Sequence, residues 1–243
     1  MIFVGTDGCK KGWLAVKLTD GLEWETRVFE DIGTLWVDFH DAAIILLIDI
    51  PIGLKDDGPN ERECDLLARK LLGNKRAASV FRPPCRKAVY SPIDKSSDIN
   101  FRITKKRLPL QTLNIIPKIR EVDTLLSNDQ SARLQIREIH PEICFWALSG
   151  GRPMQYSKKK QEGFFERQKI LESVYTKTEA IGNEASSDYR RSEVARDDVI
   201  DALVAAVTAK IGFNRFLTIP DTPPIDSKGL RMEMVYFPLE GVA

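Results

Sequence analysis

Three stretches near the N-terminus read as β-strands, and the third of them alternates between apolar and polar positions. The three stretches cover residues 2–7, 13–18 and 22–29. Residues 8–12 form a glycine-containing turn between the first two stretches. Asp20-Gly21, between the second and third, is a strong signal for a tight hairpin turn. The pattern therefore predicts three antiparallel strands that follow one another along the chain.

The next two elements have different patterns. Residues 31–40 repeat apolar side chains at helical spacing, whereas residues 43–49 are apolar without interruption until Asp49. An unbroken apolar run of this length is typical of a strand that is buried on both faces of a parallel sheet. Pro51 and Gly53 end the run, so we expect Asp49 at the tip of a central strand.

The rest of the chain predicts mainly helices. Residues 55–112 read as an insertion, which begins with a helix over 61–72 and continues in proline-containing loops. Further expected elements are a helix over 117–126 with Pro117 in its first position, a strand over 133–140, a charged helix over 157–174, a polar and mobile stretch over 176–193, an apolar helix over 194–211 and a short strand over 232–237.

This order of elements predicts a fold class. It matches the ribonuclease-H-like plan, an α/β fold in which helices cover both faces of a mixed five-stranded sheet. The first three strands of that sheet are antiparallel. We expect a single domain over residues 1–243, with a helical and loop insertion, about 55–112, after the fourth strand.

Composition argues against a membrane protein and against a disulfide-rich one. The 243 residues are 43% hydrophobic and 29% charged, and the longest apolar run, residues 42–48, is too short to cross a bilayer. No basic segment precedes the first strand, so we expect no secretion signal. The four cysteines are scattered and form no Cys-x-x-Cys pair, which fits reduced thiols and no structural zinc. We therefore expect a cytoplasmic protein.

The charge is balanced overall but uneven along the chain. The net charge is only +1, yet residues 66–107 hold twelve Lys or Arg and two Asp. A basic block on a neutral chain favours a polyanionic partner, and nucleic acid is the one we expect. The alternative is that the block is a solvated, partly mobile insertion.

Aspartates at the ends of apolar elements are the strongest chemical signal. Asp198 and Asp201 lie one helical turn apart at the start of the apolar helix, where like charges repel. Asp7 and Asp49 end two strands that are neighbours in the predicted sheet, and ligand sites gather at strand ends. Clustered carboxylates select hard divalent cations, so we expect Mg²⁺ or Mn²⁺, as two ions, at these four residues. Asp197 is expected to point away. The alternative is that the helix-start acids only complement the helix dipole.

Several sequence blocks resemble a known family. They are Gly5-x-Asp7 with Gly12-Trp13, Ile48-Asp49-Ile50-Pro51-Ile52-Gly53-Leu54, Arg62-x-Cys64-Asp65, Val80-Phe81, Glu121-Val122-Asp123, Arg137-Glu138-Ile139-His140-Pro141-Glu142 and Asp197-Asp198-x-x-Asp201-Ala202. Together they are similar to DUF429, a bacterial and archaeal family described as predicted ribonuclease-H-like nucleases. The resemblance implies the ribonuclease-H-like fold and a nuclease activity. The order of the acids is also similar to that of Holliday-junction resolvases, which are often homodimers.

Two further residues end a strand that should open towards the same site. We expect His140 to act as a general acid or base near neutral pH. Glu138, or Glu142 in its place, is expected to be a further metal ligand. The alternative for His140 is a strand end whose ring is bonded to a neighbouring carbonyl.

Five basic side chains are candidates for phosphate contacts, because arginine forks and lysine ammonium groups bind phosphate. They are Arg62, Arg69, Arg82, Arg86 and Lys158. Phe81 and Tyr90 lie near the second pair of arginines, and aromatic rings beside arginine suit distorted or single-stranded nucleic acid. The alternatives are a surface ladder of salt bridges for the first pair and a loop packed on the core for the second.

The leading hypothesis is a metal-dependent nuclease or resolvase-like phosphodiesterase. An ATP-dependent phosphotransferase of the actin and sugar-kinase type is the second, since it shares the core of this fold and Asp7-Gly8 followed by Gly12 resembles a phosphate-binding hairpin. The third is a catalytically idle nucleic-acid-binding or protein-binding scaffold, which mutually repelling carboxylates disfavour.

Overall fold

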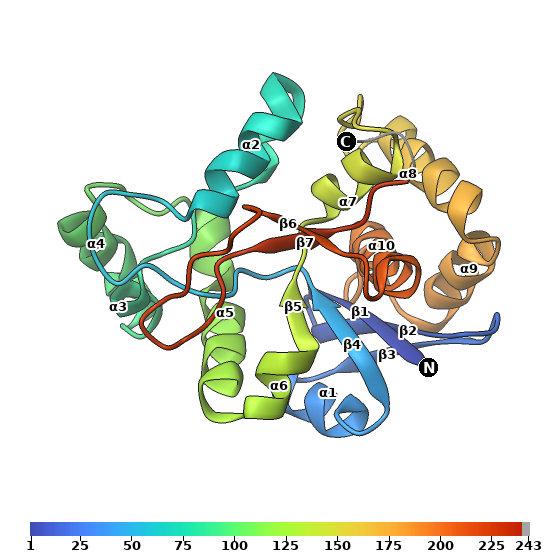
Figure 1. Ribbon diagram of the computed structural model, residues 1–243, viewed down its shortest axis with the longest axis horizontal. Helices are drawn as coiled ribbons and strands as arrows, with labels where there is room; N and C mark the ends of the chain where they lie inside the picture. Colours follow the sequence, from blue (N-terminus) through green and yellow to red (C-terminus); the bar gives the residue numbers. More distant parts are fainter. Residues whose placement is uncertain (240–243) are drawn as a thin grey trace.

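A five-stranded mixed sheet forms the centre of the molecule (Figure 1). Its strands are β1 (Ile2–Cys9), β2 (Gly12–Thr19), β3 (Trp24–Phe29), β4 (Ala43–Ile48) and β5 (Ile136–Glu138), in the order β3-β2-β1-β4-β5. β2 pairs antiparallel with both β1 and β3, and β4 pairs in parallel with both β1 and β5. The predicted α/β class with three antiparallel first strands is confirmed, and the arrangement is consistent with the ribonuclease-H-like plan.

The computed structural model describes residues 1–239. Its helices are α1 (Ile32–Phe39), α2 (Glu63–Arg76), the short 3₁₀ helix η1 (Ala77–Ser79), α3 (Arg86–Val89), α4 (Ile93–Thr104), α5 (Leu110–Asn128), α6 (Gln130–Gln135), α7 (Pro141–Leu148), α8 (Gln161–Val174), α9 (Thr178–Asp188) and α10 (Arg196–Gly212). Strands β6 (Leu217–Ile219) and β7 (Met234–Tyr236) pair with each other in a separate two-stranded sheet. None of these helices is both long and apolar enough to cross a membrane.

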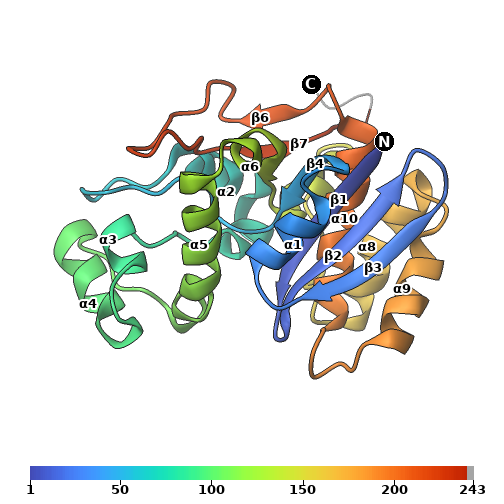
Figure 2. The ribbon, with the colours of Figure 1, turned by 90° about the horizontal axis from the view of Figure 1, so that it is seen from below.

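Alternation along the strands builds one hydrophobic core on each face of the sheet. In β2, Leu14 and Val16 pack with side chains of α7 to α10, whereas Trp13 and Ala15 pack with those of α1, α5 and α6. Figure 2 shows the helices on the two sides of the sheet. β4 is buried on both faces, which explains why its sequence is an uninterrupted apolar run.

Helix α10 lies directly against β1 at Gly5. A Cβ on Gly5 would overlap the amide nitrogen of Ala206 and the carbonyl oxygen of Ala202. Only glycine permits such a close approach of two backbones. The contact places the first turns of α10 beside the end of β1.

Three local predictions were wrong. The strand expected over 133–140 is only three residues long, because α6 occupies the preceding residues and is capped by Asp129. The stretch over 176–193 is not a mobile segment but contains α9, which buries Ile181 against the core. Pro117 lies inside α5 and not in its first position.

The insertion is more helical than expected. The region after α2 contains the short α3 and the longer α4 in place of loops. The described residues hold one sheet of the ribonuclease-H-like kind. The duplicated lobe that the phosphotransferase alternative requires is therefore not found in residues 1–239.

Candidate metal centre

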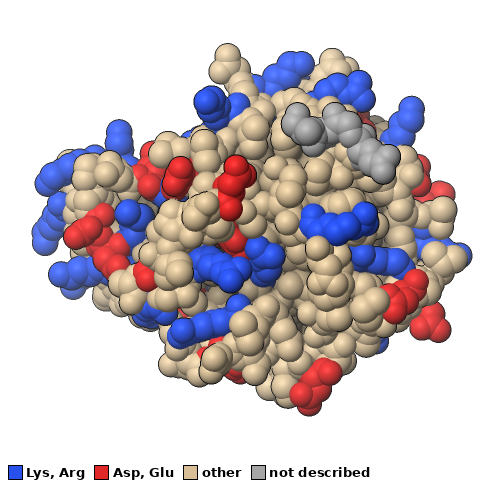
Figure 3. All heavy atoms as spheres, in the orientation of Figure 1, with Lys and Arg blue, Asp and Glu red and all other residues tan. Residues whose placement is uncertain are grey.

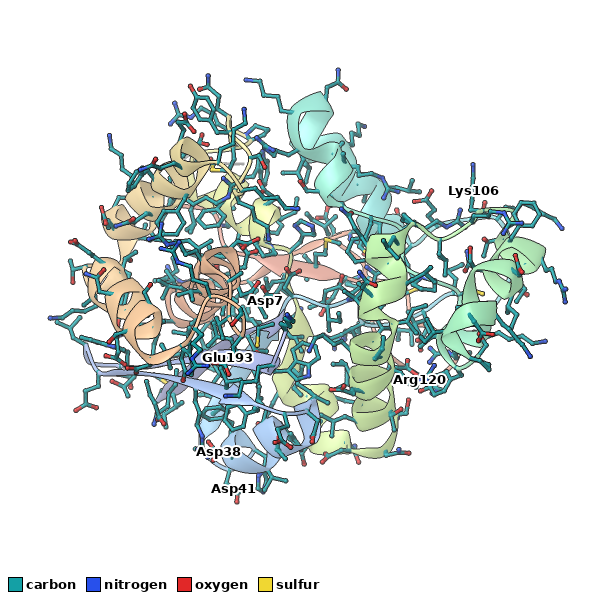
Figure 4. All side chains as sticks on the ribbon, turned by 180° about the vertical axis from the view of Figure 1, so that it is seen from behind. Asp7, Asp38, Asp41, Lys106, Arg120 and Glu193 are labelled. Carbon is teal, nitrogen blue, oxygen red and sulfur yellow. The ribbon has the colours of Figure 1, made fainter. Side chains whose placement is uncertain are left out.

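Three of the expected aspartates converge at one edge of the sheet. Asp7 lies near the end of β1, Asp49 follows β4 directly, and Asp201 comes from the second turn of α10. One carboxylate oxygen from each lies within 4.8 Å of the others. Figure 4 shows Asp7 near the middle of the molecule, between α10 and α5. Three carboxylates from distant parts of the chain thus share one small volume.

Backbone geometry holds these carboxylates in place. Strands β1 and β4 are paired in parallel up to Thr6 and Ile48, and the amide of Asp49 donates to the carbonyl of Thr6 over 3.0 Å. The two aspartates therefore leave adjacent strand ends at the same height. The amide of Gly8 donates to Oδ1 of Asp7 over 2.7 Å, which fixes that carboxylate.

Asp201 carries an observation that points to a cation. Its side chain is only 1% exposed, and its Oδ1 has no hydrogen-bond partner among residues 1–239. Leaving a buried carboxylate oxygen without a partner is costly. A hard divalent cation bound by Asp7, Asp49 and Asp201 would satisfy this oxygen, so the residues present fit such an ion.

The cationic group that forms an ion pair with this cluster is Lys158, while Lys118 lines the adjoining cavity. The ammonium nitrogen of Lys158 forms an ion pair with Oδ2 of Asp201 and lies 3.7 Å from Oδ2 of Asp197. Lys158 belongs to the segment before α8 and is about one-third exposed. It is the one member of the five basic candidates that reaches the carboxylates.

Burial and mutual repulsion raise the pKa of each carboxyl in the cluster. Desolvation is the largest cause of the raised pKa of Asp7, followed by the charges of Asp49 and Asp201. The pKa of Asp49 is raised by desolvation and then by Asp201. Desolvation also raises the pKa of Asp201, and the nearby Lys158 opposes this shift. The cluster therefore holds protons more tightly than free aspartates do, unless another cation neutralises it.

The surroundings of Asp197 and Asp198, in the first turn of α10, differ from the prediction. Asp198 accepts a hydrogen bond from the amide of Ala195 over 2.8 Å and so caps its own helix. It is not one of the three residues whose oxygens come together. Burial raises the pKa of Asp198 to about 6. Asp197, expected to point away, lies near Lys158, which also pairs with Asp201.

Glu138 lines the same cavity as Asp7 and Asp49, but it is held by an arginine and is not one of the three converging carboxylates. Its two oxygens accept hydrogen bonds from the guanidinium of Arg62, each over 2.8 Å, and one also accepts from the amide of Ile52. Arg62 also donates to both oxygens of Asp65. All three side chains are buried, so Arg62 is not available for a phosphate.

Arg62→Met is expected to destabilise the protein by about 3 kcal/mol, because it leaves two buried carboxylates without a counter-charge. Urea denaturation followed by circular dichroism measures the effect. The double variant Arg62→Met with Glu138→Gln should recover part of the loss, since one of the two charges is then gone. Equal stability of the single variant and the wild type would show that these carboxyls are not ionised.

His140 caps helix α7, a role that was not predicted, and its ring also lies near a carbonyl oxygen, as the alternative interpretation expects. Its Nδ1 accepts a hydrogen bond from the amide of Glu142 over 3.2 Å, and its Nε2 lies 3.3 Å from the carbonyl oxygen of Ser79. Desolvation lowers the pKa of His140, which favours the neutral ring. The ring still lines a cavity of about 150 Å³ together with Asp7, Asp49 and Phe81.

Glu142, like Glu138, lies close enough to the cluster for its charge to act on Asp49. One of its oxygens pairs with the buried Arg167, and the other, Oε2, is buried without a hydrogen-bond partner in residues 1–239. Its charge raises the pKa of both Asp49 and Asp201. Glu142 was predicted only as a replacement for Glu138, because the short helix α7 on which it lies was not predicted.

The remaining arginine candidates are engaged within the protein. Arg69 pairs with Glu61 and donates to the carbonyl of Val80 over 3.0 Å. Arg82 donates to the carbonyl of Pro59 over 2.7 Å. Arg86 is bound by three carboxylates, those of Asp56, Asp123 and Asp226. The structure therefore does not bring these arginines to the carboxylate cluster.

Fold and site together define an α/β protein with a mixed five-stranded sheet, consistent with the ribonuclease-H-like plan, and a carboxylate cluster at the ends of its central strands. The family described as "Protein of unknown function (DUF429)" matches residues 5–225 of the sequence, so the chain belongs to the DUF429 family. Comparison with curated proteins and comparison with solved structures each gave no match.

Proposed function

We propose that this protein is a metal-dependent phosphodiesterase that acts on nucleic acid, as a nuclease or a resolvase-like enzyme. The observation that carries the proposal is the convergence of Asp7, Asp49 and Asp201, one of which has a buried oxygen without a hydrogen-bond partner in residues 1–239. Mg²⁺ or Mn²⁺ bound there would activate water and stabilise the leaving oxygen of a phosphodiester.

The chain's own groups suit this role in two ways. The Gly8 amide and the β1–β4 pairing hold Asp7 and Asp49 in a fixed arrangement, which reduces the cost of ordering them when a cation binds. The cavity that adjoins both aspartates is where we expect the substrate phosphate to approach. Because the cluster must release protons to bind a cation, affinity should rise with pH.

The proposal extends to stoichiometry, partner and location. We propose two ions at the centre, nucleic acid as the substrate and the cytoplasm as the location. The resemblance to junction resolvases makes a homodimer the assembly to test, and sedimentation velocity measures it directly.

A titration and a cleavage assay test the proposal together. Isothermal titration with Mn²⁺ should show binding by the wild type, with a stoichiometry that reports one or two ions. Single-stranded, duplex and branched DNA and RNA should then be incubated with the protein in EDTA, Mg²⁺ and Mn²⁺. Cleavage that needs the metal supports the proposal, and absence of both metal binding and cleavage overturns it.

Two variants on one helix provide the matched control. Asp201→Asn should lose Mn²⁺ binding and cleavage, because it removes the charge of a converging carboxylate. Asp197→Asn, one turn away, should retain both, since Asp197 is not one of the converging three. Equal loss in the two variants would mean that general helix electrostatics, and not a metal site, is responsible.

Lys158→Met is expected to tighten Mn²⁺ binding about tenfold, because a competing cation beside Asp201 is removed. The exposed neighbour Lys160, changed to Met, serves as the control and should leave the affinity unchanged. Isothermal titration measures both. Weaker binding in Lys158→Met would instead show that the lysine positions the carboxylates.

A further inference from the structure

Residues 86–107 form an arm that stands out from the sheet. The arm consists of α3, α4 and the residues that follow α4, and it lies on the far side of α5 from the sheet (Figures 1 and 2). It makes up the second half of the basic block of the sequence. Its place in the fold separates it from the carboxylate cluster.

The arm is fixed to the body by buried polar contacts. At its base, Arg86 is bound by Asp123 of α5 and by Asp226. The guanidinium of Arg120, also on α5, donates to the carbonyls of Val89 and Ser91, the latter over 2.9 Å. These contacts argue against a loosely attached, solvated insertion.

Hydrogen bonds inside the arm fix its own shape. The side chain of Asn100 is fully buried, accepts from the amide of Cys85 and donates to the carbonyl of Lys106, each over 2.8 Å. Thr104 donates to the carbonyl of Asn100 over 2.9 Å. The arm therefore presents its outer side chains from a fixed backbone.

Half of the exposed residues of the arm are cationic. The exposed basic residues are Lys87, Lys95, Arg102, Lys105, Lys106 and Arg107. The same span holds two acids, Asp94 and Asp98, and only Asp98 forms an ion pair, with Arg107 over 2.7 Å. Blue side chains accordingly crowd the left side of Figure 3, over α3 and α4. Lys106 lies at the upper edge of the arm in Figure 4.

Aromatic rings lie among these charges. Phe101 and Tyr90 are 43% and 44% exposed. The guanidinium of Arg107 lies 5.1 Å from the centre of the Phe101 ring, and the ammonium of Lys228 lies 4.8 Å from that of Tyr90. Exposed rings interleaved with cations can stack on bases while the charges contact phosphates.

We propose that the α3–α4 arm is a binding surface for single-stranded nucleic acid, which holds the substrate strand outside the carboxylate centre. The arginines first considered for this task are paired within the protein, whereas the arm carries six exposed cations on a fixed frame. The connection with cleavage rests on the proposed function. Binding of nucleic acid by the arm does not rest on the proposed function, and it can be measured without the metal.

The test compares two triple variants of the full-length chain. Lys95→Gln, Arg102→Gln and Lys106→Gln together remove three charges from the arm, and none of the three side chains has a hydrogen bond or ion pair in the described structure. Lys169→Gln, Arg190→Gln and Arg191→Gln together remove three exposed charges elsewhere. Equal melting temperatures of both variants and the wild type show that folding is intact.

Fluorescence anisotropy with a labelled single-stranded DNA of about 30 nucleotides, in EDTA and over a range of KCl, gives the affinity. Loss of three phosphate contacts should weaken binding on the order of 100-fold at about 0.1 M salt and reduce the slope of log K against log salt by about 2. The control triple variant should bind nearly as well as the wild type. Equal affinities of the arm variant and the control would overturn the proposal.

The outcomes separate this proposal from the proposed function. Binding that depends on the arm, without cleavage in any metal, would leave the arm in place and count against the phosphodiesterase. Metal-dependent cleavage of the long strand with the same KM in the arm variant and the wild type would support the phosphodiesterase and count against the arm. Binding of the wild type to phosphatidylserine vesicles but not to DNA would overturn the proposal in favour of a membrane surface.

Discussion

Asp7→Asn is expected to abolish Mn²⁺ binding and to lower the rate of any nucleic-acid cleavage about 1,000-fold or more, as loss of an ion that supplies several kcal/mol of transition-state stabilisation would do. The substitution is close to isosteric, and the asparagine oxygen can still accept the hydrogen bond from Gly8. What it removes is one of the three negative charges of the cluster. Isothermal titration and single-turnover cleavage measure the two losses.

The same substitution should make the metal-free protein more stable at neutral and alkaline pH. The pKa of Asp7 is raised by desolvation and by Asp49 and Asp201, so the folded protein holds a proton that the unfolded chain releases. A raised pKa costs stability above the unfolded value, near pH 4 for aspartate, and the cost grows as pH rises through the folded value. The advantage of Asp7→Asn should therefore be absent below about pH 4 and grow towards pH 8.

Scanning calorimetry in a chelating buffer should show a melting temperature about 3 °C or more above that of the wild type at pH 8. Asp188→Asn, at an exposed position, is the control and should show no such gain. A lower melting temperature in Asp7→Asn would mean that this carboxylate stabilises the fold even without a cation. The combination of lost metal binding and increased stability is specific to a site that is built from repelling charges.

The sequence alone predicted where Asp7, Asp49 and Asp201 lie on their strands and helix, because each position follows from a pattern that depends on burial. The run over 43–49 identifies a central strand, and its end identifies Asp49. Helix α10 is apolar along most of its length, so the aspartate at position 201 is identified as a candidate functional residue.

The predictions that were wrong depend on side-chain orientation and on short helices and strands. Asp197 and Asp198 share the first turn of α10, and only the cap on Ala195 decides which of them turns back to the helix. The partnership of Arg62 with Glu138 joins residues 76 positions apart, and no periodicity indicates it. Short elements such as α3 and α7 are stabilised by tertiary contacts, which local patterns do not contain.

Gly5→Ala is expected to destabilise the protein by about 4 kcal/mol or more, at the upper end of what one added methyl group costs in a packed core. The added carbon would overlap backbone atoms of Ala202 and Ala206, which cannot move without shifting the whole of α10. Urea denaturation measures the loss. Gly21→Ala is the matched control and should cost little, because a Cβ there meets only the hydroxyl of Thr19 at 3.6 Å.

A second consequence of Gly5→Ala should appear in the folded fraction. Displacing α10 moves Asp201 relative to Asp7 and Asp49, so Mn²⁺ affinity should fall even where the protein remains folded. A variant that is destabilised but binds Mn²⁺ with unchanged affinity would show that the position of the helix start does not depend on the contact at Gly5.

The contact between β1 and α10 also determines when the candidate centre can assemble during synthesis of the chain. Asp7, the first residue of the candidate centre to be made, and Asp201, the last, are nearly two hundred positions apart. A nascent chain on the ribosome has no complete centre until α10 has emerged and docked on the first strand. The proposed cleavage activity would thus be absent while the chain is still beside the RNA that encodes it, and a protease that removed this one helix would remove Asp201 from the centre.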